Sequence, residues 1–342
     1  MEIFKPFFGR RGDGVWEIQA MASVPLKPKN AEDSDFYAVE NDMFVAQPNI
    51  IGTIHSVLAK SIVPIVAHVP GETHLRCLGT GFFISCTGLL ITAAHVITDP
   101  IDRRYGGTRE LDEQTWHFGQ LKLGVMLPVS PLAGFKGYIF RDIEWAGFLG
   151  ERTIHPIPIR GVEIKLTSDT ALCKVTELGA GIAHQPLPII QPGLRGIGIA
   201  VGKSATAIGY AGMQDVELSM ERSDMASGDF RFELHVSRGT VLERFPDNAE
   251  CRQVPTPGAC FSASMKLPAG MSGSPIFDDE RLYVHGVVSK GWEDESGPSN
   301  HGYGSMLEHS LRIPIRFLDG KTLLDLFKEQ EHGLPKFFIP DA

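Results

Sequence analysis

The stretch "PAGMSGSPIF", residues 268–277, places two serines in a glycine turn immediately before an apolar run. Gly270 can adopt backbone angles that other residues avoid, so its N–H and the N–H of Ser272 can point at one spot. Two such donors form a site that stabilises a developing oxyanion. Gly273 leaves space behind the serine, and Pro275 can end the turn and begin a strand. The stretch therefore predicts a nucleophile at Ser272, whereas the simpler interpretation is a flexible loop.

A nucleophilic serine needs a base within hydrogen-bond reach, and that base needs an orienting acid. In "GLLITAAHVIT", residues 88–98, His95 follows a predicted strand and a turn of small residues. In "KLTSDTALCKV", residues 165–175, Asp169 precedes an apolar strand, where a half-buried carboxylate needs a partner such as an imidazole N–H. Taken singly, each has an ordinary interpretation, a histidine at a strand end and an aspartate in a turn.

Other motifs fail on their spacing. "GIGIAVGKSA", residues 196–205, resembles a phosphate loop, but Ile197 stands where the first glycine is required. "GMSGS" lacks the last glycine of the α/β-hydrolase nucleophile elbow, because Ser274 stands there. The 12 histidines form no HExxH or comparable ligand spacing, so we expect no metal site. Nothing in the sequence implies a cofactor.

The composition favours an all-β fold. The chain has 342 residues, 43% of them hydrophobic, which suits a sizeable core. Its 37 glycines and 23 prolines disfavour a long all-α fold. From about Ile51, short runs such as "GTGFFIS" and "LYVHGVVS" alternate with turns, which indicates a barrel or sandwich. Residues 1 to about 50 read as an extension with little regular structure, and "DGKTLLDLFKEQEH", residues 319–332, predicts an amphipathic helix.

Charge and segment patterns bear on partners and location. The net charge of −9 disfavours nucleic acid as a partner. We see no signal peptide and no membrane-spanning run, so we expect a cytoplasmic protein without a membrane partner. The five cysteines form no CxxC, and we expect buried free thiols.

The three motifs, in the order His, Asp, Ser, together resemble a trypsin-like serine peptidase of the chymotrypsin fold, nearest to its bacterial trypsin-like and glutamyl-endopeptidase branch. The matches are "TAAHV", "SDTALCKV", "GMSGSPIF" and "HGVVSKG", within roughly residues 55–315. The resemblance implies two antiparallel six-stranded β-barrels. It predicts four parts of the chain: an N-terminal extension (1–52), a first barrel (53–183), a second barrel (184–318) and a C-terminal helix and tail (319–342). The proline-rich segment 184–193 is the expected boundary between the barrels.

By the same resemblance, His95 is the general base and then acid, Asp169 holds its tautomer, and Ser272 attacks a peptide bond. The N–H groups of Gly270 and Ser272 are the oxyanion donors. The expected substrate is a protein or peptide that forms an acyl-enzyme.

The resemblance also places substrate-binding residues. Ser289, Lys290 and Gly291 lie on the strand that pairs with an extended substrate. Lys266 lies six residues before Ser272, near the primary pocket. The segment that contains His301 resembles the far wall of that pocket. Positive groups there favour an acidic substrate side chain, unless the lysines point to solvent.

Two departures from the family pattern bear on regulation. Met271 stands where digestive zymogens carry aspartate, so activation through that aspartate is not implied, and an activating partner is an alternative route. The long stretch between His95 and Asp169 includes a candidate surface insertion, residues 97–116. Ser274 occupies a common glycine position and is interpreted as a space-filler. The alternatives to an endopeptidase are a catalytically silent binding or scaffold module and an esterase.

Overall fold

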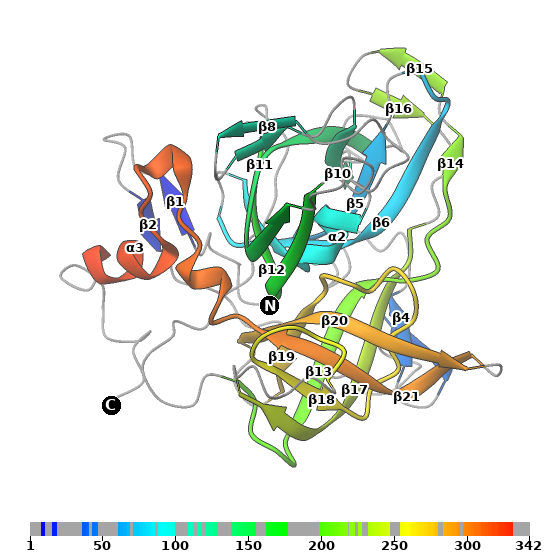
Figure 1. Cartoon of the computed structure of the whole chain (residues 1–342). Coiled ribbons are helices and arrows are strands. Elements are labelled where there is room, and N and C mark those ends of the chain that lie inside the picture. The colour runs from blue at the N-terminus through cyan, green and yellow to red at the C-terminus, as the bar shows by residue number, and fades with distance from the viewer. Residues whose placement is uncertain are drawn as a thin grey trace.

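The computed structural model describes most of the chain from residue 61 to residue 330. Figure 1 shows two β-barrels stacked on each other, with a helical segment at one side. The described ranges are 61–68, 71–85, 88–99, 121–128, 138–154, 162–176, 198–217, 219–222, 225–227, 232–246, 254–279, 283–294 and 297–330, with short strands at 8–10, 16–18, 36–40, 43–46, 109–112 and 115–117.

The first barrel is a closed ring of six antiparallel strands in the order β10-β5-β6-β7-β12-β11, in which β11 pairs back onto β10. Their apolar, β-branched sequences suit a closed sheet that is filled by side chains. The strands are β5 (Ile62–His68), β6 (His74–Phe83), β7 (Leu89–Thr92), β10 (Lys122–Pro128), β11 (Tyr138–Ile154) and β12 (Val162–Val175).

The second barrel is also a closed ring of six antiparallel strands, in the order β13-β19-β20-β21-β18-β17, with β17 pairing back onto β13. The two rings confirm the fold class expected from the sequence. The strands are β13 (Ser204–Tyr210), β17 (Leu234–Phe245), β18 (Cys260–Ala263), β19 (Pro275–Asp278), β20 (Val284–Asp294) and β21 (Gly297–Met306).

The two barrels share one continuous hydrophobic core. It runs from Phe82 and Leu90 of the first barrel through Ile208 and Val287 of the second to Leu323 near the C-terminus, all of them fully buried. Burying each such side chain contributes about 1.5–3 kcal/mol. This packing fixes the barrels relative to each other, which matters because the candidate site draws residues from both.

Several strands belong to neither six-stranded ring. The strands β14 (Val216–Glu217) and β16 (Met225–Ser227) pair with β6 and β11 of the first barrel, although they fall within the range expected for the second. β15 (Ser219–Arg222) pairs with β16. The domain ranges remain a prediction, and the segment 184–193 lies outside the described residues.

The N-terminal segment contains more regular structure than we expected. It forms two hairpins, β1 (Phe8–Arg10) with β2 (Trp16–Ile18) and β3 (Phe36–Glu40) with β4 (Met43–Ala46). β4 also pairs with β17 at residues 235–237. The edge of β17 offers backbone groups that a further strand can satisfy, and the extension supplies that strand.

Short elements complete the fold. A hairpin of β8 (Arg109–Asp112) and β9 (Thr115–His117) overlaps the insertion predicted between His95 and Asp169. The helical pieces within the described ranges are α2 (Ala94–Thr98), η3 (Ser310–Arg312), η4 (Arg316–Leu318) and α3 (Leu323–Gln330).

The predicted C-terminal helix is confirmed as α3. Its start is fixed by a reciprocal cap, in which the Asp325 N–H donates to the Thr322 hydroxyl at 3.2 Å and the Thr322 N–H donates to the Asp325 carboxylate at 2.9 Å. Leu323 and Leu326 are buried on the face that packs on the barrels. No helix in the described part of the chain is long and apolar enough to cross a membrane.

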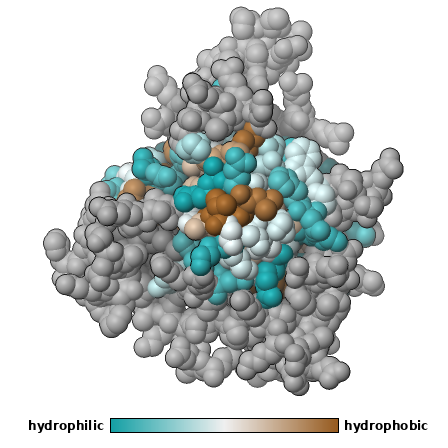
Figure 2. Space-filling view, turned by 90° about the horizontal axis from the view of Figure 1, so that it is seen from below, coloured by the Kyte–Doolittle hydropathy of each residue, from teal (hydrophilic) through white to brown (hydrophobic). Residues whose placement is uncertain are grey.

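The surface seen from below in Figure 2 carries a small apolar patch surrounded by hydrophilic residues. The exposed apolar side chains of the described residues include Val201 and Leu242. These two lie on neighbouring segments, because the Gly202 N–H donates to the Val241 carbonyl at 2.8 Å. A few exposed apolar residues of this kind are normal on a protein surface.

Candidate active site

His95 lies on α2, the one-turn helix that follows β7 directly. Ala93 and Ala94, which precede it, are fully buried. Their small side chains let the chain turn tightly against the first barrel, as the sequence predicted. The His95 side chain remains 28% exposed, so it is accessible from solvent.

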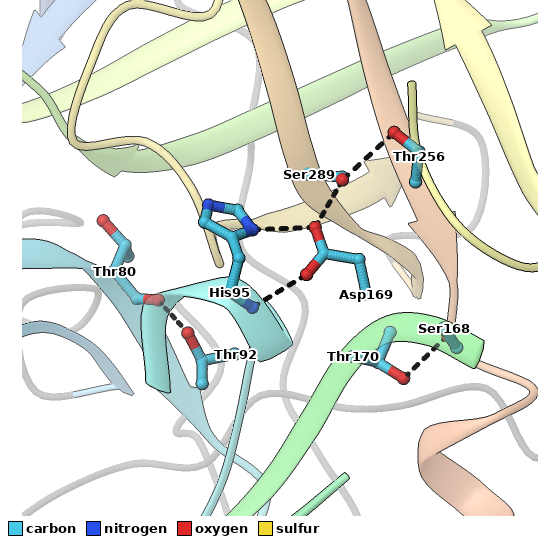
Figure 3. Close-up of polar contacts among 8 residues, drawn as sticks. All are labelled: Thr80, Thr92, His95, Ser168, Asp169, Thr170, Thr256 and Ser289. Atoms are coloured by element: carbon cyan, nitrogen blue, oxygen red, sulfur yellow. Dashed lines mark hydrogen bonds and ion pairs between the residues drawn. The ribbon is translucent and has the colours of Figure 1, made fainter. Parts of the chain in front are cut away.

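Asp169 reaches His95 because β12 bulges beside it. Ala171 pairs with Phe148 and Leu166 pairs with Gly150, so the four residues 167–170 of β12 lie opposite the single residue 149 of β11. Such a bulge redirects side chains out of the regular alternation. The Ser168 and Thr170 hydroxyls lie 3.3 Å apart on either side of Asp169 (Figure 3). The sequence placed Asp169 before a strand, whereas the structure places it within one.

Two hydrogen bonds join Asp169 to His95. The His95 Nδ1 lies 2.8 Å from Asp169 Oδ2, and the backbone N–H of His95 donates to Asp169 Oδ1 at 2.9 Å (Figure 3). The Asp169 side chain is only 4% exposed. A buried carboxylate needs partners of this kind, and here they also fix the orientation of the imidazole ring.

The second barrel supplies a third hydrogen bond to the same carboxylate. The Ser289 hydroxyl on β20 donates to Asp169 Oδ2, and the Thr256 hydroxyl donates to Ser289 Oγ at 3.1 Å (Figure 3). The sequence suggested Ser289 as a substrate-cleft residue, whereas the structure shows its buried hydroxyl on Asp169. Thr256 was not anticipated, because nothing in its local sequence signals a contact with β20.

The pKa of His95 reflects opposing influences. Burial lowers this pKa, but the hydrogen bond that His95 donates to Asp169, the charge of Asp169 and the charge of Asp99 together raise it above its usual value. The positive charge of Lys290 opposes this rise. A histidine stabilised in this way can hold a proton transiently and then release it.

The loop around Ser272 is held mainly by its own backbone. The N–H groups of Met271, Gly273 and Ser274 donate to the carbonyls of Pro268, Val288 and Met271, respectively. Within the described residues, no hydrogen bond uses the N–H of Gly270 or of Ser272.

Glycines at two positions make this loop conformation possible. Gly270 has a φ of +96° and Gly273 a φ of +88°, a region that favours glycine. Among the described residues, the loop therefore leaves without a hydrogen-bond partner the two N–H groups that the sequence predicted as oxyanion donors.

The Ser272 loop packs directly against the start of the His95 helix. A methyl group at Gly273 would overlap the Thr80 carbonyl oxygen and the Thr92 hydroxyl, and would lie 3.1 Å from the Ala93 nitrogen. Ala93 is two residues before His95. Within the described part of the chain, no hydrogen bond joins the Ser272 hydroxyl to His95, and such bonds often form only when substrate binds.

Residues on either side of Ser272 are buried. Met271 is fully buried in the apolar core of the second barrel, so an apolar side chain suits this position. Ser274 is also fully buried, and its Oγ fills the space beside Gly209, in agreement with the interpretation of a space-filling residue.

The remaining predicted residues lie around β20 and β21. Lys266 is half-buried, and Lys290 is exposed with its ammonium 5.2 Å from the ring centre of Trp292. Gly291 packs against the carbonyl of Leu267, and His301 Nε2 lies 3.2 Å from the Tyr303 hydroxyl. The roles of Lys266, Lys290 and Gly291 in substrate binding remain predictions.

Other predictions about special groups can be checked only for the described residues. Cys173 and Cys260 are buried free thiols, as expected, and Cys77 is a free thiol that is only partly buried. Cys86 and Cys251 lie outside the described residues. Within the part of the chain that the structure describes, no group of three or more His, Cys, Asp or Glu side chains could hold a metal ion.

The double barrel with a His–Asp pair facing a serine turn defines the class of protein as chymotrypsin-like. The trypsin-like peptidase domain family matches residues 79–287, more than half of the chain, and the chain belongs to that family. No curated protein sequence matches it.

Solved structures with a similar fold are distant in sequence. Deg5 is 17% identical over 69% of this chain and 81% of its own, with a TM-score of 0.36. The Rv3671c protein of M. tuberculosis H37Rv is 15% identical over 78% of this chain and 91% of its own, with a TM-score of 0.37. The protease Anisep of Arthrobacter nicotinovorans is 15% identical over 72% and 89%, with a TM-score of 0.39.

Proposed function

We propose that the chain is a serine endopeptidase that hydrolyses peptide bonds through an acyl-enzyme intermediate. The observation that carries this proposal is the 2.8 Å contact between His95 Nδ1 and Asp169 Oδ2, beside a serine turn with two unpaired N–H groups among the described residues. Membership of a peptidase family supports the same conclusion.

In the proposed reaction, Ser272 Oγ attacks the carbonyl carbon of the scissile peptide while its proton passes to His95 Nε2. The carbonyl oxygen becomes an oxyanion that accepts hydrogen bonds from the N–H groups of Gly270 and Ser272. The C–N bond then breaks as the imidazolium gives its proton to the leaving amine, which leaves an ester on Ser272. Water attacks that ester, loses a proton to His95, and releases the acid while Ser272 regains its proton.

Asp169 supports both proton transfers through His95. Its carboxylate accepts from Nδ1–H, which leaves the Nε2 lone pair free to take the serine proton, and it stabilises the imidazolium that forms. The Ser289 hydroxyl and the His95 backbone N–H supply two further hydrogen bonds to this buried carboxylate.

An edge of β20 is suited to bind the substrate backbone. β19 pairs with β20 up to Val287, and the next bonds go to the Ser272 turn, from Gly273 N–H to the Val288 carbonyl and from Val288 N–H to the Ser274 carbonyl. Among the described residues, no strand pairs on that side with residues 289–291. An extended peptide can add there as a further strand, as the resemblance implied for Ser289, Lys290 and Gly291.

The test is covalent labelling with a fluorophosphonate probe, which reacts with activated serines. We expect the parent protein and Ser274→Ala to be labelled and Ser272→Ala to remain unlabelled. Labelling that persists in Ser272→Ala would contradict the assigned nucleophile. Failure to label the parent, before and after limited proteolysis of its N-terminal segment, would instead favour the silent binding module.

A substrate comparison separates a peptidase from an esterase. The unlabelled parent protein should cleave a denatured protein such as casein, and Ser272→Ala should not. Hydrolysis of p-nitrophenyl acetate with no cleavage of any protein or peptide in a broad library would identify an esterase. The cytoplasmic location and the activating partner remain predictions.

A further inference from the structure

Thr80 on β6 connects the first barrel to the Ser272 loop through two of its polar groups, the backbone N–H and the side-chain hydroxyl. Its N–H donates to the Ser272 carbonyl at 2.7 Å, and its hydroxyl donates to the Gly270 carbonyl at 3.0 Å. The hydroxyl also accepts the Tyr210 N–H at 3.0 Å. The Thr80 carbonyl accepts the Thr92 hydroxyl at 2.7 Å (Figure 3).

Two of these contacts hold peptide units that are neighbours, along the chain, of the units that carry the proposed oxyanion donors. The carbonyls of Gly270 and Ser272 each belong to the peptide unit that follows the residue, whereas their N–H groups belong to the unit before it. The two held units therefore flank the peptide unit between Met271 and Ser272, which carries the Ser272 N–H. The first of them also adjoins the unit that carries the Gly270 N–H, whose Ala269 carbonyl accepts the Gly212 N–H at 3.0 Å. Gly270 is the weakest point of this turn, because a glycine at a φ of +96° can rotate its peptide more readily than other residues.

The direction of the Thr80 hydroxyl bond is set by its neighbours. Because the Tyr210 N–H donates to the hydroxyl oxygen, the hydroxyl proton is directed to the Gly270 carbonyl. Thr80 is fully buried, so water does not compete for that carbonyl. Since Thr92 lies three residues before His95, the same residue also ties the Ser272 turn to the position of the base.

We propose that Thr80 is a positioning residue for the oxyanion site, and that its hydroxyl keeps the N–H of Gly270 directed at the scissile carbonyl oxygen. This inference rests on the proposed function, because it assigns a role within the same site. It predicts an effect on the chemical step and none on the titration of His95, which Thr80 does not contact.

The test uses Thr80→Val, which keeps the side-chain shape and both backbone bonds and removes only the hydroxyl. Loss of a whole oxyanion donor lowers the rate about 10²–10³-fold. A donor that is displaced but still present should lower the limiting rate of fluorophosphonate inactivation by about tenfold, with the probe's binding constant and the pH midpoint unchanged. Thr80→Ser, which retains the hydroxyl, should restore most of the rate.

Thr206→Val is the matched control. Thr206 is another fully buried threonine, on β13, whose hydroxyl donates to Asp279 away from the site. It should lower the melting temperature without changing the inactivation rate. An unchanged rate in Thr80→Val, or a rate that Thr80→Ser does not restore, would overturn the inference.

Two further comparisons keep the inference testable. If Thr80→Val does not fold, Thr80→Ser is compared with Thr80→Ala, and equal rates in these two would overturn the role of the hydroxyl. A parent protein that the probe does not label would refute the proposed function itself. A labelled parent with an unaffected Thr80→Val would refute only the role of Thr80.

Discussion

The two halves of the candidate site are held in place by different kinds of interaction. His95 and Asp169 are held by side-chain hydrogen bonds, to which Ser289 and Thr256 of the other barrel contribute. The Ser272 turn is held mostly by backbone hydrogen bonds and by glycines at positive φ, with one side-chain bond from the Thr80 hydroxyl. A substitution in the first half should therefore disturb charge and proton position, whereas one in the second half should disturb geometry.

The largest effect should come from Asp169→Asn, which alters the first half with little change in shape. An amide whose NH₂ faces Nδ1 would favour the wrong imidazole tautomer, so His95 Nε2 would carry a proton and could not accept another. Loss of the orienting carboxylate lowers kcat by about 10⁴-fold in such triads. Steady-state cleavage of casein-derived peptides, together with thermal melting, measures the effect.

Asp279→Asn is the control for this change. Asp279 is a second buried carboxylate that accepts from two hydroxyl groups, those of Ser204 and Thr206. It should lose stability without a comparable loss of rate. If Asp169→Asn retained more than about a tenth of the parental kcat, Asp169 would not be orienting the base.

The next largest effect should come from Gly273→Ala, in the second half. The added methyl group would overlap backbone and side-chain atoms of Thr80 and Thr92, and alanine is strained at a φ of +88°. The Ser272 turn must then move away from the His95 helix. A displacement of about 1 Å can lower the rate about 10²-fold. Probe inactivation rates and thermal melting measure the two consequences.

Gly202→Ala separates backbone strain from steric overlap. Gly202 has a similar φ of +82°, but a methyl group there would meet no atom within 4 Å. This variant should show the strain alone, about 1–2 kcal/mol, with a parental rate. Equal losses of stability in the two variants would show that contact with Thr80 and Thr92 is unimportant.

Features that depend on local sequence could be predicted, whereas contacts between residues far apart in the chain could not. The β-rich fold, the place of His95 after a strand and the serine turn rest on local patterns: short β-rich runs, a small-residue turn, and glycines flanking Ser272. The two barrels followed from the family resemblance, and the helix of His95 was not predicted. Thr80 and Thr256 were missed because their partners, Gly270 and Ser289, lie 190 and 33 residues away in the chain. A threonine within a strand carries no sign of which carbonyl or hydroxyl it will meet.

The pairing of strands likewise could not be predicted from local sequence patterns. The bulge of β12 depends on the register with β11, which sequence alternation does not specify. The pairing of β14 with β6 and of β4 with β17 depends on which barrel edges are left open. Propensity could indicate that these segments are extended, but not where they attach.

The smallest predicted effect concerns the charges around His95. Burial and the Lys290 charge lower the pKa of His95, whereas Asp169 and Asp99 raise it. Only neutral His95 can accept the serine proton, so the rate falls as pH drops through this pKa. Lys290→Gln removes a cation and should raise the pKa, moving the acidic limb of the inactivation rate to higher pH. Asp99→Asn should move it to lower pH.

Because the two variants should shift the pKa of His95 in opposite directions, each serves as a control for the other. The pH midpoint is compared and not the plateau, so a contact between Lys290 and the probe does not affect the result. Both shifts should shrink as ionic strength rises, because the charge of exposed Lys290 is screened by salt. Shifts of the same sign in the two variants would mean that the limb reports a group other than His95. Such a result would contradict the proposed proton transfer through His95 and Asp169, but it would not bear on the geometry of the Ser272 turn.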